Sequence, residues 1–297
     1  MSPTLSQARG RSLIDGGEYC LTAEDFRRIS AMIHADAGIS MPAHKATLVY
    51  SRLAKRLRIL GLKDFSEYCA LVASAEGSGE RQEMLAALTT NVTRFYREPH
   101  HFEHLRTHIL PPLIASARKG GRVRLWSAAC SSGQEPYSIA LTVLSLLPDA
   151  AQRDIRILAT DIDPNMIAIS KSGLYDRSAI EPVPSDLRQR WFAPVEGDRG
   201  MVRIADQARA LVEFRRLNLI GDWPMRGTFQ AIFCRNVAIY FDDPTQGKIW
   251  SRMVTLLDPA GALYIGHSER VSGPAERKLR SDGITTYRPR GETEAGR

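Results

Sequence analysis

Two stretches of the chain, about 30 residues apart, carry residues that could hold a nucleoside. The first runs from a short apolar strand, Val123–Trp126, through a turn of small residues to Pro136, which suits the first turn of a helix. The second is a predicted strand, Ile155–Thr160, followed directly by Asp161. A turn without bulk lets a ligand approach the backbone, and a carboxylate at a strand end can accept both ribose hydroxyls. The turn is not G-x-G-x-x-G, so each half is weak alone, but together they favour a nucleoside site.

The elements that must position these residues alternate as in an α/β protein. Apolar residues after Pro136 mark one face of a helix, so a strand, a tight turn and a helix N-terminus follow one another, as in nucleotide-binding folds. A further helix is predicted at Pro164–Ser172. The alternation resumes later with predicted strands at Thr228–Cys234, Ala262–Gly266 and Ile284–Arg288 and a helix at Asp243–Leu257.

The segment from about residue 177 to 216 breaks this alternation. A predicted helix, Ser185–Trp191, precedes three short predicted strands, with a hairpin turn at Glu196–Gly200 between the first two. On its own residues the segment could be a plain surface hairpin. The predicted strands are Phe192–Val195, Met201–Ala205 and Leu211–Arg216.

Length and composition indicate a globular protein of about two domains. Of its 297 residues, 43% are hydrophobic and 25% are charged. No apolar run approaches the roughly 18 residues of a membrane helix, and residues 1–17 lack a hydrophobic signal core. The four cysteines form no C-x-x-C pair, which favours reduced thiols over disulfides or zinc. These features predict a cytoplasmic protein without direct membrane insertion.

Residues 19–90 are predicted to form a small helical domain after a flexible tail at residues 1–18. Thr22 and Asp25 have the spacing of a capping box, which opens a helix by pairing two side chains with the free backbone N–H groups. Gly61 is a suitable stop for the second helix. A bundle of this size has no room for a catalytic centre of its own, so we predict a role in recognition.

Much of the net charge of +7 lies in the second helix of this domain. The segment from Lys45 to Lys63 contains six basic residues and no acid. Arg52, Lys55 and Arg56 are spaced i, i+3, i+4 and therefore share a face. This face is either simply solvated or a docking surface for an acidic partner, which could be nucleic acid or an acidic helical protein.

Three histidines follow the helical domain at the spacing of metal ligands on one helix face. They are His100, His104 and His108, which recur every four residues after Pro99. No carboxylate or cysteine completes a facing set in the sequence. We therefore favour a solvated or partly packed histidine face and predict no metal.

Six segments carry long and unusual motifs. They are Asn-Val-Thr-Arg-Phe-Tyr-Arg-Glu-Pro-His-His-Phe at 91–102, Trp-Ser-Ala-Ala-Cys-Ser-Ser-Gly-Gln-Glu-Pro-Tyr-Ser at 126–138, Ala-Thr-Asp-Ile-Asp at 159–163, Asn-Leu at 218–219, Phe-Cys-Arg-Asn-Val-Ala-Ile-Tyr-Phe-Asp at 233–242 and Gly-His-Ser-Glu at 266–269. Together they resemble the chemotaxis receptor methyltransferases, bacterial enzymes that methylate glutamates of chemoreceptors with S-adenosylmethionine. The resemblance covers roughly Thr22 to Arg288. Ser132 and Gln134 stand where the family more often has Thr and Glu.

The resemblance implies a Rossmann-like, S-adenosylmethionine-dependent methyltransferase domain of the α/β class at residues 91–290. A helical, receptor-recognising domain precedes it, a small antiparallel β subdomain is inserted at about residues 177–216, and residues 291–297 form a frayed tail. Some family members dock a short receptor tether on that subdomain. The implied product is S-adenosylhomocysteine. The implied cofactor-binding residues are Asn91, Thr93, Arg97, Glu135, Asp161, Asn218, Leu219, Asn236 and Val237.

Methylation of a carboxylate asks little of catalytic side chains. Glutamate has a solution pKa of about 4.3, so it is ionised near neutral pH and can attack without a general base. Alignment and exclusion of water are then the main tasks of the enzyme. Arg97 is predicted to hold either the incoming carboxylate or the carboxylate of the cofactor. Tyr240 is predicted to line the methyl-transfer channel, with a core position as the alternative.

Two other functions remain open at this point. One is methylation of nucleic acid or of another protein, which the basic charge would suit, although Phe233-Cys-Arg-Asn236 replaces the Asn-Pro-Pro-Tyr type of element found in enzymes that methylate base amines. The other is a non-enzymatic module that binds S-adenosylmethionine. The favoured prediction is a monomeric enzyme that acts on the cytoplasmic helical region of chemoreceptors, without nucleic acid as a partner, and is recruited to membrane receptor clusters.

Overall fold

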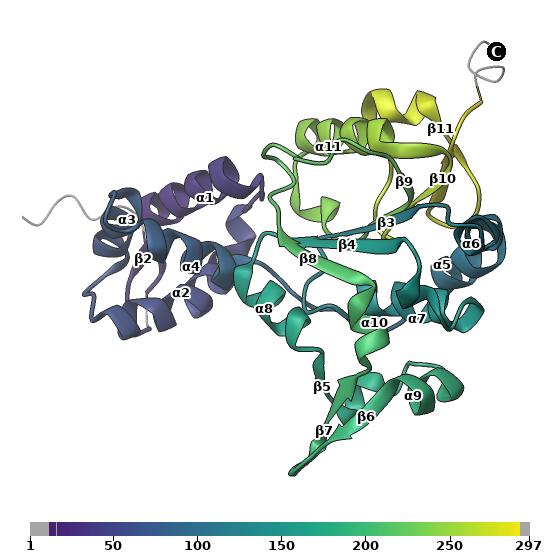
Figure 1. Ribbon diagram of the computed structural model, residues 1–297. Helices are drawn as coiled ribbons and strands as arrows, with labels where there is room; N and C mark the ends of the chain where they lie inside the picture. Colours follow the sequence, from purple (N-terminus) through teal and green to yellow (C-terminus); the bar gives the residue numbers. More distant parts are fainter. Residues whose placement is uncertain (1–11, 16, 292–297) are drawn as a thin grey trace, which may run out of the picture. The chain divides into compact units, whose positions relative to one another are not determined.

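The structure is a computed structural model that describes residues 12–15 and 17–291. Figure 1 shows its helices and strands. The chain forms two compact units that meet in sequence between Thr90 and Asn91. Within the described residues, no helix is both long and apolar enough to cross a membrane.

The first unit is a bundle of helices whose ends are set by local signals. Thr22 accepts a hydrogen bond from the backbone N–H of Asp25, whose carboxylate accepts one from the backbone N–H of Thr22, which confirms the predicted capping box. Gly38 and Gly61 end the first two α-helices with φ of 71° and 67°, a conformation that costs glycine little. The helices are α1 Ala23–Ala37, η1 Ala43–Lys45, α2 Ala46–Leu60, α3 Phe65–Ala73 and α4 Ser78–Leu88.

A short antiparallel pair of strands precedes this bundle. β1, Ser12–Ile14, pairs with β2, Leu21–Thr22, and Leu21 is fully buried. The prediction of a flexible tail is therefore wrong for residues 12–14, because a three-residue strand leaves little periodicity in the sequence to identify it. Residues 1–11 and 16 of the predicted tail lie outside the described residues.

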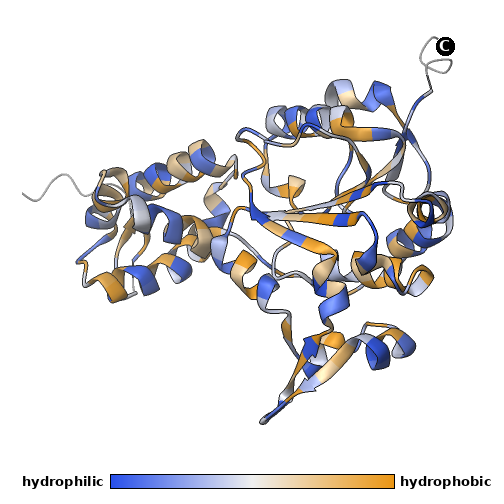
Figure 2. Cartoon of the chain, in the orientation of Figure 1, coloured by the Kyte–Doolittle hydropathy of each residue, from blue (hydrophilic) through white to orange (hydrophobic). Residues whose placement is uncertain are grey.

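The second unit is built on a seven-stranded sheet in the order β11-β12-β10-β9-β3-β4-β8. The strands from β10 to β8 are parallel to their neighbours, whereas β12 is antiparallel to β10 and β11. Parallel strands covered on both faces must be apolar nearly throughout, and in Figure 2 hydrophobic residues recur along the central strands. The strands are β3 Val123–Ala128, β4 Ile155–Asp161, β8 Val212–Arg216, β9 Phe229–Cys234, β10 Leu257–Ile265, β11 Leu279–Ser281 and β12 Thr286–Pro289.

Helices cover both faces of this sheet. In Figure 1, α11 lies on one side of it, and α7 and α8 lie on the other. From β3 the chain proceeds outward to β4 and β8 and then returns to β9 on the opposite side of β3. In such sheets ligands bind at the carboxyl ends of the strands beside this switch in direction. The helices are α5 Pro99–His104, the π-helical η2 Leu105–Ile109, α6 Leu110–Arg118, α7 Gln134–Leu146, η3 Ala150–Gln152, α8 Pro164–Ser172, α10 Asp206–Ala210, η5 Ala238–Tyr240, α11 Asp243–Leu256 and η6 Gly273–Lys278.

A small three-stranded antiparallel sheet lies between α8 and α10 in the chain. Its order is β5-β7-β6, with β5 at Leu174–Asp176, β6 at Phe192–Val195 and β7 at Asp198–Ile204; η4 Arg177–Ile180 and α9 Ser185–Trp191 connect β5 to β6. The predicted strand Leu211–Arg216 does not belong to this insertion, because its residues form β8, which is parallel to β4 in the main sheet. Its buried residues alternate with exposed ones, as in a hairpin strand, and that pattern misled the prediction.

Candidate functional site

The turn between β3 and α7, residues 129–133, has an unusual backbone. Ala129, Ser131 and Gly133 all have positive φ, of 59°, 50° and 94°, which is costly for a residue with a side chain. A Cβ atom at Gly133 would lie 2.8 Å from the Tyr175 hydroxyl, which donates a hydrogen bond to a carbonyl of the turn. The turn, called the nucleoside loop below, is therefore held in one conformation at the carboxyl end of β3.

Asp161 ends β4 and faces the nucleoside loop. Its carboxylate accepts hydrogen bonds from the backbone N–H groups of Ser131, at 2.7 Å, and Asp163, at 2.9 Å. Burial raises the pKa of Asp161, because desolvation disfavours the charged form. Each carboxylate oxygen has a second lone pair that can accept a hydroxyl hydrogen. The position and the remaining capacity of Asp161 suit the predicted ribose role.

The linker that opens the second unit, residues 91–98, is attached to the nucleoside loop. The Ser131 hydroxyl donates a hydrogen bond to the carbonyl of Asn91 at 2.9 Å, and the Asn91 amide donates to Asp163 at 3.3 Å. Asn91 therefore lies beside the Asp161 end of the site, and its role in cofactor binding stays a prediction. Thr93 is half-buried in the same linker, and in the described part of the chain its side chain forms no hydrogen bond.

Glu135 lies in the first turn of α7, where the helix dipole favours a negative charge. Its side chain is only 12% exposed and accepts hydrogen bonds from the Ser127 hydroxyl, at 2.7 Å, and from Arg235, at 3.0 Å. Burial raises the pKa of Glu135, even though the Arg235 guanidinium opposes this change. Burial therefore disfavours the ionised form of Glu135 more than the Arg235 guanidinium favours it.

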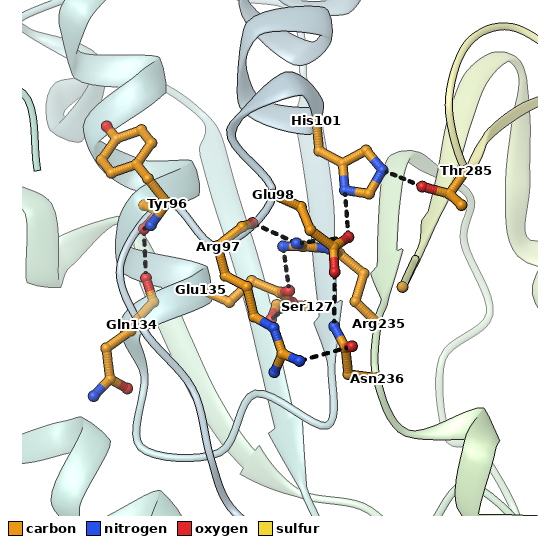
Figure 3. A network of polar contacts seen from close by, with 12 residues as sticks. Tyr96, Arg97, Glu98, His101, Ser127, Gln134, Glu135, Arg235, Asn236 and Thr285 are labelled. Carbon is orange, nitrogen blue, oxygen red and sulfur yellow. Dashed lines mark hydrogen bonds and ion pairs between the residues drawn. The ribbon is translucent and has the colours of Figure 1, made fainter. Parts of the chain in front are cut away.

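Arg235 is the residue that joins the two sides of the site, and it was not among the predicted site residues. Its side chain is 2% exposed and forms ion pairs with Glu98, at 3.1 Å, and Glu135, at 3.0 Å (Figure 3). It also donates a short hydrogen bond to the carbonyl of Arg97. The guanidinium thus fixes the linker to α7 and, through Glu135, to β3. A charged residue directly after the apolar strand Phe229–Cys234 was the signal that could have identified it.

Glu98 is the second residue of this network that the sequence analysis missed. Burial would raise its pKa, but Arg235, together with hydrogen bonds from Asn236 and His267, lowers the pKa of Glu98 to about 2. It has a positive φ of 57° just before α5. An ionised carboxylate therefore occupies this position over the whole physiological pH range.

The side chains of Arg97 and Asn236 contact each other at one end of this network. Arg97 donates hydrogen bonds to the Asn236 side-chain oxygen, at 2.9 Å, and to the Val92 carbonyl, at 3.0 Å (Figure 3 shows the first of these). The Asn236 amide donates to Glu98 at 3.3 Å. Among the described residues, no carboxylate lies within ion-pair distance of the Arg97 guanidinium, whose hydrogen-bond partners Asn236 and Val92 are both neutral.

Asn218 and Leu219 follow β8 and reach the same edge of the sheet as Asp161. The backbone N–H of Leu217 donates to the carbonyl of Asp161 at 2.9 Å, which places the start of this segment beside the predicted ribose site. Arg252 and Trp223 hold the segment by donating hydrogen bonds to the carbonyl of Leu219. The carboxyl ends of parallel strands thus collect predicted cofactor residues that lie far apart in the sequence.

Val237 and Tyr240 complete the predicted set. Both are half-buried, and Tyr240 lies in η5, four residues after Asn236. A half-buried ring fits a channel wall better than a core position, which would be fully buried. The role of Tyr240 in the methyl-transfer channel stays a prediction.

Of the three predicted histidines, His104 packs against the end of the sheet, whereas His100 and His108 are exposed. His104 forms hydrogen bonds with the Tyr264 hydroxyl, at 2.9 Å, and the Asp282 carboxylate, at 3.1 Å, and its ring stacks on His108. The carboxylate that the sequence did not reveal is thus Asp282, which lies 178 residues away and pairs with one histidine. His101, Glu98 and His100 also bring potential ligand atoms within 4.8 Å of one another, but Glu98 already pairs with Arg235. We assign no metal to this cluster.

The basic residues of α2 are partly used within the first unit. Arg56 forms a bidentate pair with Glu80, at 3.0 and 2.5 Å, and Arg52 donates to the carbonyls of Ala87 and Thr89 at the end of α4. The three predicted side chains therefore do not form one free basic face, because the negative end of α4 and its acids lie opposite two of them. Lys55 is exposed, and its role in receptor binding stays a prediction.

Comparison with known proteins gives two family models that together span most of the chain. "CheR methyltransferase, all-alpha domain" matches residues 24–89, and "CheR methyltransferase, SAM binding domain" matches residues 91–287. These matches confirm the predicted arrangement of a helical domain followed by a domain that binds S-adenosylmethionine.

Whole-length relatives point to the same family. The chain is 58% identical to a "Probable chemotaxis protein methyltransferase" of Rhizobium etli, over 86% of this chain and 96% of the relative. It is 43% identical to the "Chemotaxis protein methyltransferase" of Escherichia coli, over 90% of this chain and 91% of the relative. It is 41% identical to "Chemotaxis protein methyltransferase 2" of Pseudomonas aeruginosa, over 92% of this chain and 95% of the relative.

Proposed function

Because the chain belongs to the chemotaxis protein methyltransferase family, we propose that it methylates glutamate side chains of chemotaxis receptors. The products are glutamate methyl esters and S-adenosylhomocysteine, and the enzyme acts at membrane receptor clusters. The observation that supports a carboxylate as the acceptor is the Arg97 guanidinium, which lies among the proposed cofactor residues and has only neutral hydrogen-bond partners.

The charges of the site suit S-adenosylmethionine. Two carboxylates, Glu98 and Glu135, share the buried guanidinium of Arg235, so these three side chains carry a net charge of −1 when both carboxylates are ionised. Burial is the main reason that the pKa of Glu135 is raised, and the nearby Glu98 carboxylate adds to this change. The amino group of the cofactor would neutralise Glu135, and its ribose hydroxyls would donate to Asp161. When bound, the cofactor supplies a methyl group on a positively charged sulfur.

The proposed reaction needs alignment and requires no proton transfer. The glutamate carboxylate forms an oxygen–methyl bond while the methyl–sulfur bond breaks, so charge is neutralised in the transition state. Arg97 holds the carboxylate in line through its fork of N–H donors, and Tyr240 lines the path of the methyl group. Exclusion of water from the site strengthens both effects.

Loss of Asp161 tests the cofactor assignment. We expect Asp161→Ala to weaken binding of S-adenosylmethionine by about 1–3 kcal/mol, because charge-assisted hydrogen bonds to the ribose disappear. Isothermal titration calorimetry measures the change. Asp161→Asn is the matched variant, since its amide keeps one acceptor for the nucleoside loop. Wild-type affinity in both variants would remove Asp161 from the ribose site.

Transfer of a labelled methyl group tests the proposed activity. We expect the purified protein to move label from S-adenosylmethionine to receptor-containing membranes, and we expect alkali to release that label as methanol, as it does from esters. Label that resists alkali would identify a different acceptor, such as nucleic acid or an amine. Cofactor binding without any transfer would identify a binding module.

The first unit is proposed to recognise the receptor, and Lys55 tests this role. Exposed charges act over about 8 Å at physiological ionic strength, so Lys55→Glu should raise KM for an acidic receptor helix by a few-fold at low salt, with less effect at high salt. Cofactor affinity should not change. Arg56→Glu is the contrasting variant: it breaks the pair with Glu80, so it should lower the thermal stability of the first unit. If Lys55→Glu shows wild-type kinetics with the receptor, α2 does not take part in receptor recognition through Lys55.

A further inference from the structure

The motif Gly-His-Ser-Glu at residues 266–269 has no role in the function described so far. It forms the turn after β10, and Glu269 is 9% exposed. Its carboxylate accepts hydrogen bonds from five backbone N–H groups. The donors are Asn236 at 2.9 Å, Val237 at 2.8 Å, Ala238 at 2.7 Å, Ile239 at 3.4 Å and Gly266 at 2.6 Å.

Four of these donors belong to one segment, residues 236–239, which leaves the carboxyl end of β9. Successive N–H groups that converge on one point attract an anion, and here the anion is a side chain of the same protein. Asn236 has a positive φ of 59°, a conformation that costs energy in a residue with a side chain. The hydrogen bonds to Glu269 offset this cost and hold the segment in its turn.

The held segment carries groups that face the reaction site. The Asn236 side chain contacts Arg97 at 2.9 Å and Glu98 at 3.3 Å, and η5 with Tyr240 follows directly. The contact has no spare room, because a Cβ atom at Gly266 would lie 2.7 Å from the Asn236 nitrogen and 2.9 Å from a Glu269 oxygen. A side chain at Gly266 would therefore displace Asn236, Glu269 or both.

We propose that Glu269 is a positioning residue that holds Asn236 and Val237 in the geometry that binds the cofactor and that, through Asn236, orients the Arg97 guanidinium. It acts only through backbone N–H groups, on residues that are themselves proposed to touch the cofactor. This inference rests on the proposed function only for the cofactor role of Asn236 and Val237.

Three variants test this role. Glu269→Gln replaces one acceptor oxygen with a donor that faces N–H donors. Gly266→Ala keeps the carboxylate but forces the contact apart, and Ser268→Ala, at an exposed position of the same turn, is the matched control. The measurements are S-adenosylmethionine affinity by calorimetry and hydrogen exchange of the amides of residues 236–238, both well below the melting temperature.

We expect Glu269→Gln and Gly266→Ala to raise the Kd for S-adenosylmethionine at least about tenfold and to speed exchange of these amides at least about tenfold. Ser268→Ala should stay within about twofold of wild type in both. A residue that only supports the fold would lower the melting temperature and leave both quantities unchanged, and that result overturns the proposal. Should Glu269→Gln fail to fold, the same two quantities in Gly266→Ala decide.

Neither measurement involves a methyl acceptor. A protein that methylates something other than receptor glutamates would still show the expected losses in these variants. Failure of the positioning role would instead appear as wild-type affinity and amide protection in a protein that still methylates receptors.

Discussion

Alanine in place of Arg97 should lower the turnover number by about 10²-fold, the loss that misalignment of a reacting group can cause. Cofactor affinity should change much less, because a guanidinium that aligns the acceptor carboxylate contacts the acceptor and not the cofactor. The uncompensated charge of Arg97 in the structure is the basis of this expectation. Single-turnover rates with a receptor fragment, together with calorimetry for the cofactor, separate the two quantities.

Arg97→Lys is the matched variant for this experiment. It keeps the positive charge but loses the planar fork, so we expect a turnover between those of wild type and Arg97→Ala. If cofactor affinity falls as steeply as turnover in both variants, Arg97 holds the carboxylate of the cofactor, which was the alternative role predicted from the sequence. The acceptor would then need another partner.

Removal of the Arg235 guanidinium should destabilise the second unit by about 3–5 kcal/mol, because Glu98 and Glu135 would lose the buried cation with which both of them pair. Arg235→Met keeps much of the side-chain volume, so the loss reports the charge. Urea unfolding at pH 7 measures it. Arg277→Met, at an exposed position, is the control and should stay within about 0.5 kcal/mol of wild type.

The pH dependence of stability gives this prediction a second measurement. The folded-state pKa of Glu98 is lowered from 4.5 to about 2, so its contribution to stability is present above pH 4.5 and is lost as the pH falls toward 2. In Arg235→Met this contribution should be smaller, because only the hydrogen bonds from Asn236 and His267 would still lower the pKa of Glu98, so the acid side of the stability profile should be flatter. If Arg235→Met has the unfolding midpoint and the acid profile of wild type, Arg235 does not stabilise the ionised forms of Glu98 and Glu135.

Signals within a few residues of one another were enough to predict part of this protein. The Thr22–Asp25 capping box and the stop at Gly61 appear where the sequence places them, because caps depend on neighbouring backbone groups. Apolar runs followed by a polar residue identified the strand that ends at Asp161 and the strand that ends shortly before Asn236. Parallel strands then had to bring these ends to one edge of the sheet, and the motifs indicated which cofactor would bind there.

Pairing between distant charges could not be derived in this way. Arg56 and Glu80 are 24 residues apart, and Arg235 lies 100 residues from Glu135, so no periodicity connects them. The spacing of basic residues on α2 therefore predicted a free basic face, but Arg52 and Arg56 pair with groups of α4 within the bundle.

Local patterns and motifs in the sequence were sufficient to predict the family, the cofactor and the alternation of strands and helices. Three features could be identified only from the folded chain: the sheet to which Val212–Arg216 belongs, the carboxylates around Arg235, and the backbone N–H groups that donate to Glu269. Each of these depends on the chain folding back on itself over many residues. A buried charge or backbone N–H without a partner costs free energy. It therefore pairs with a group that packing brings close, and that group can lie anywhere in the sequence.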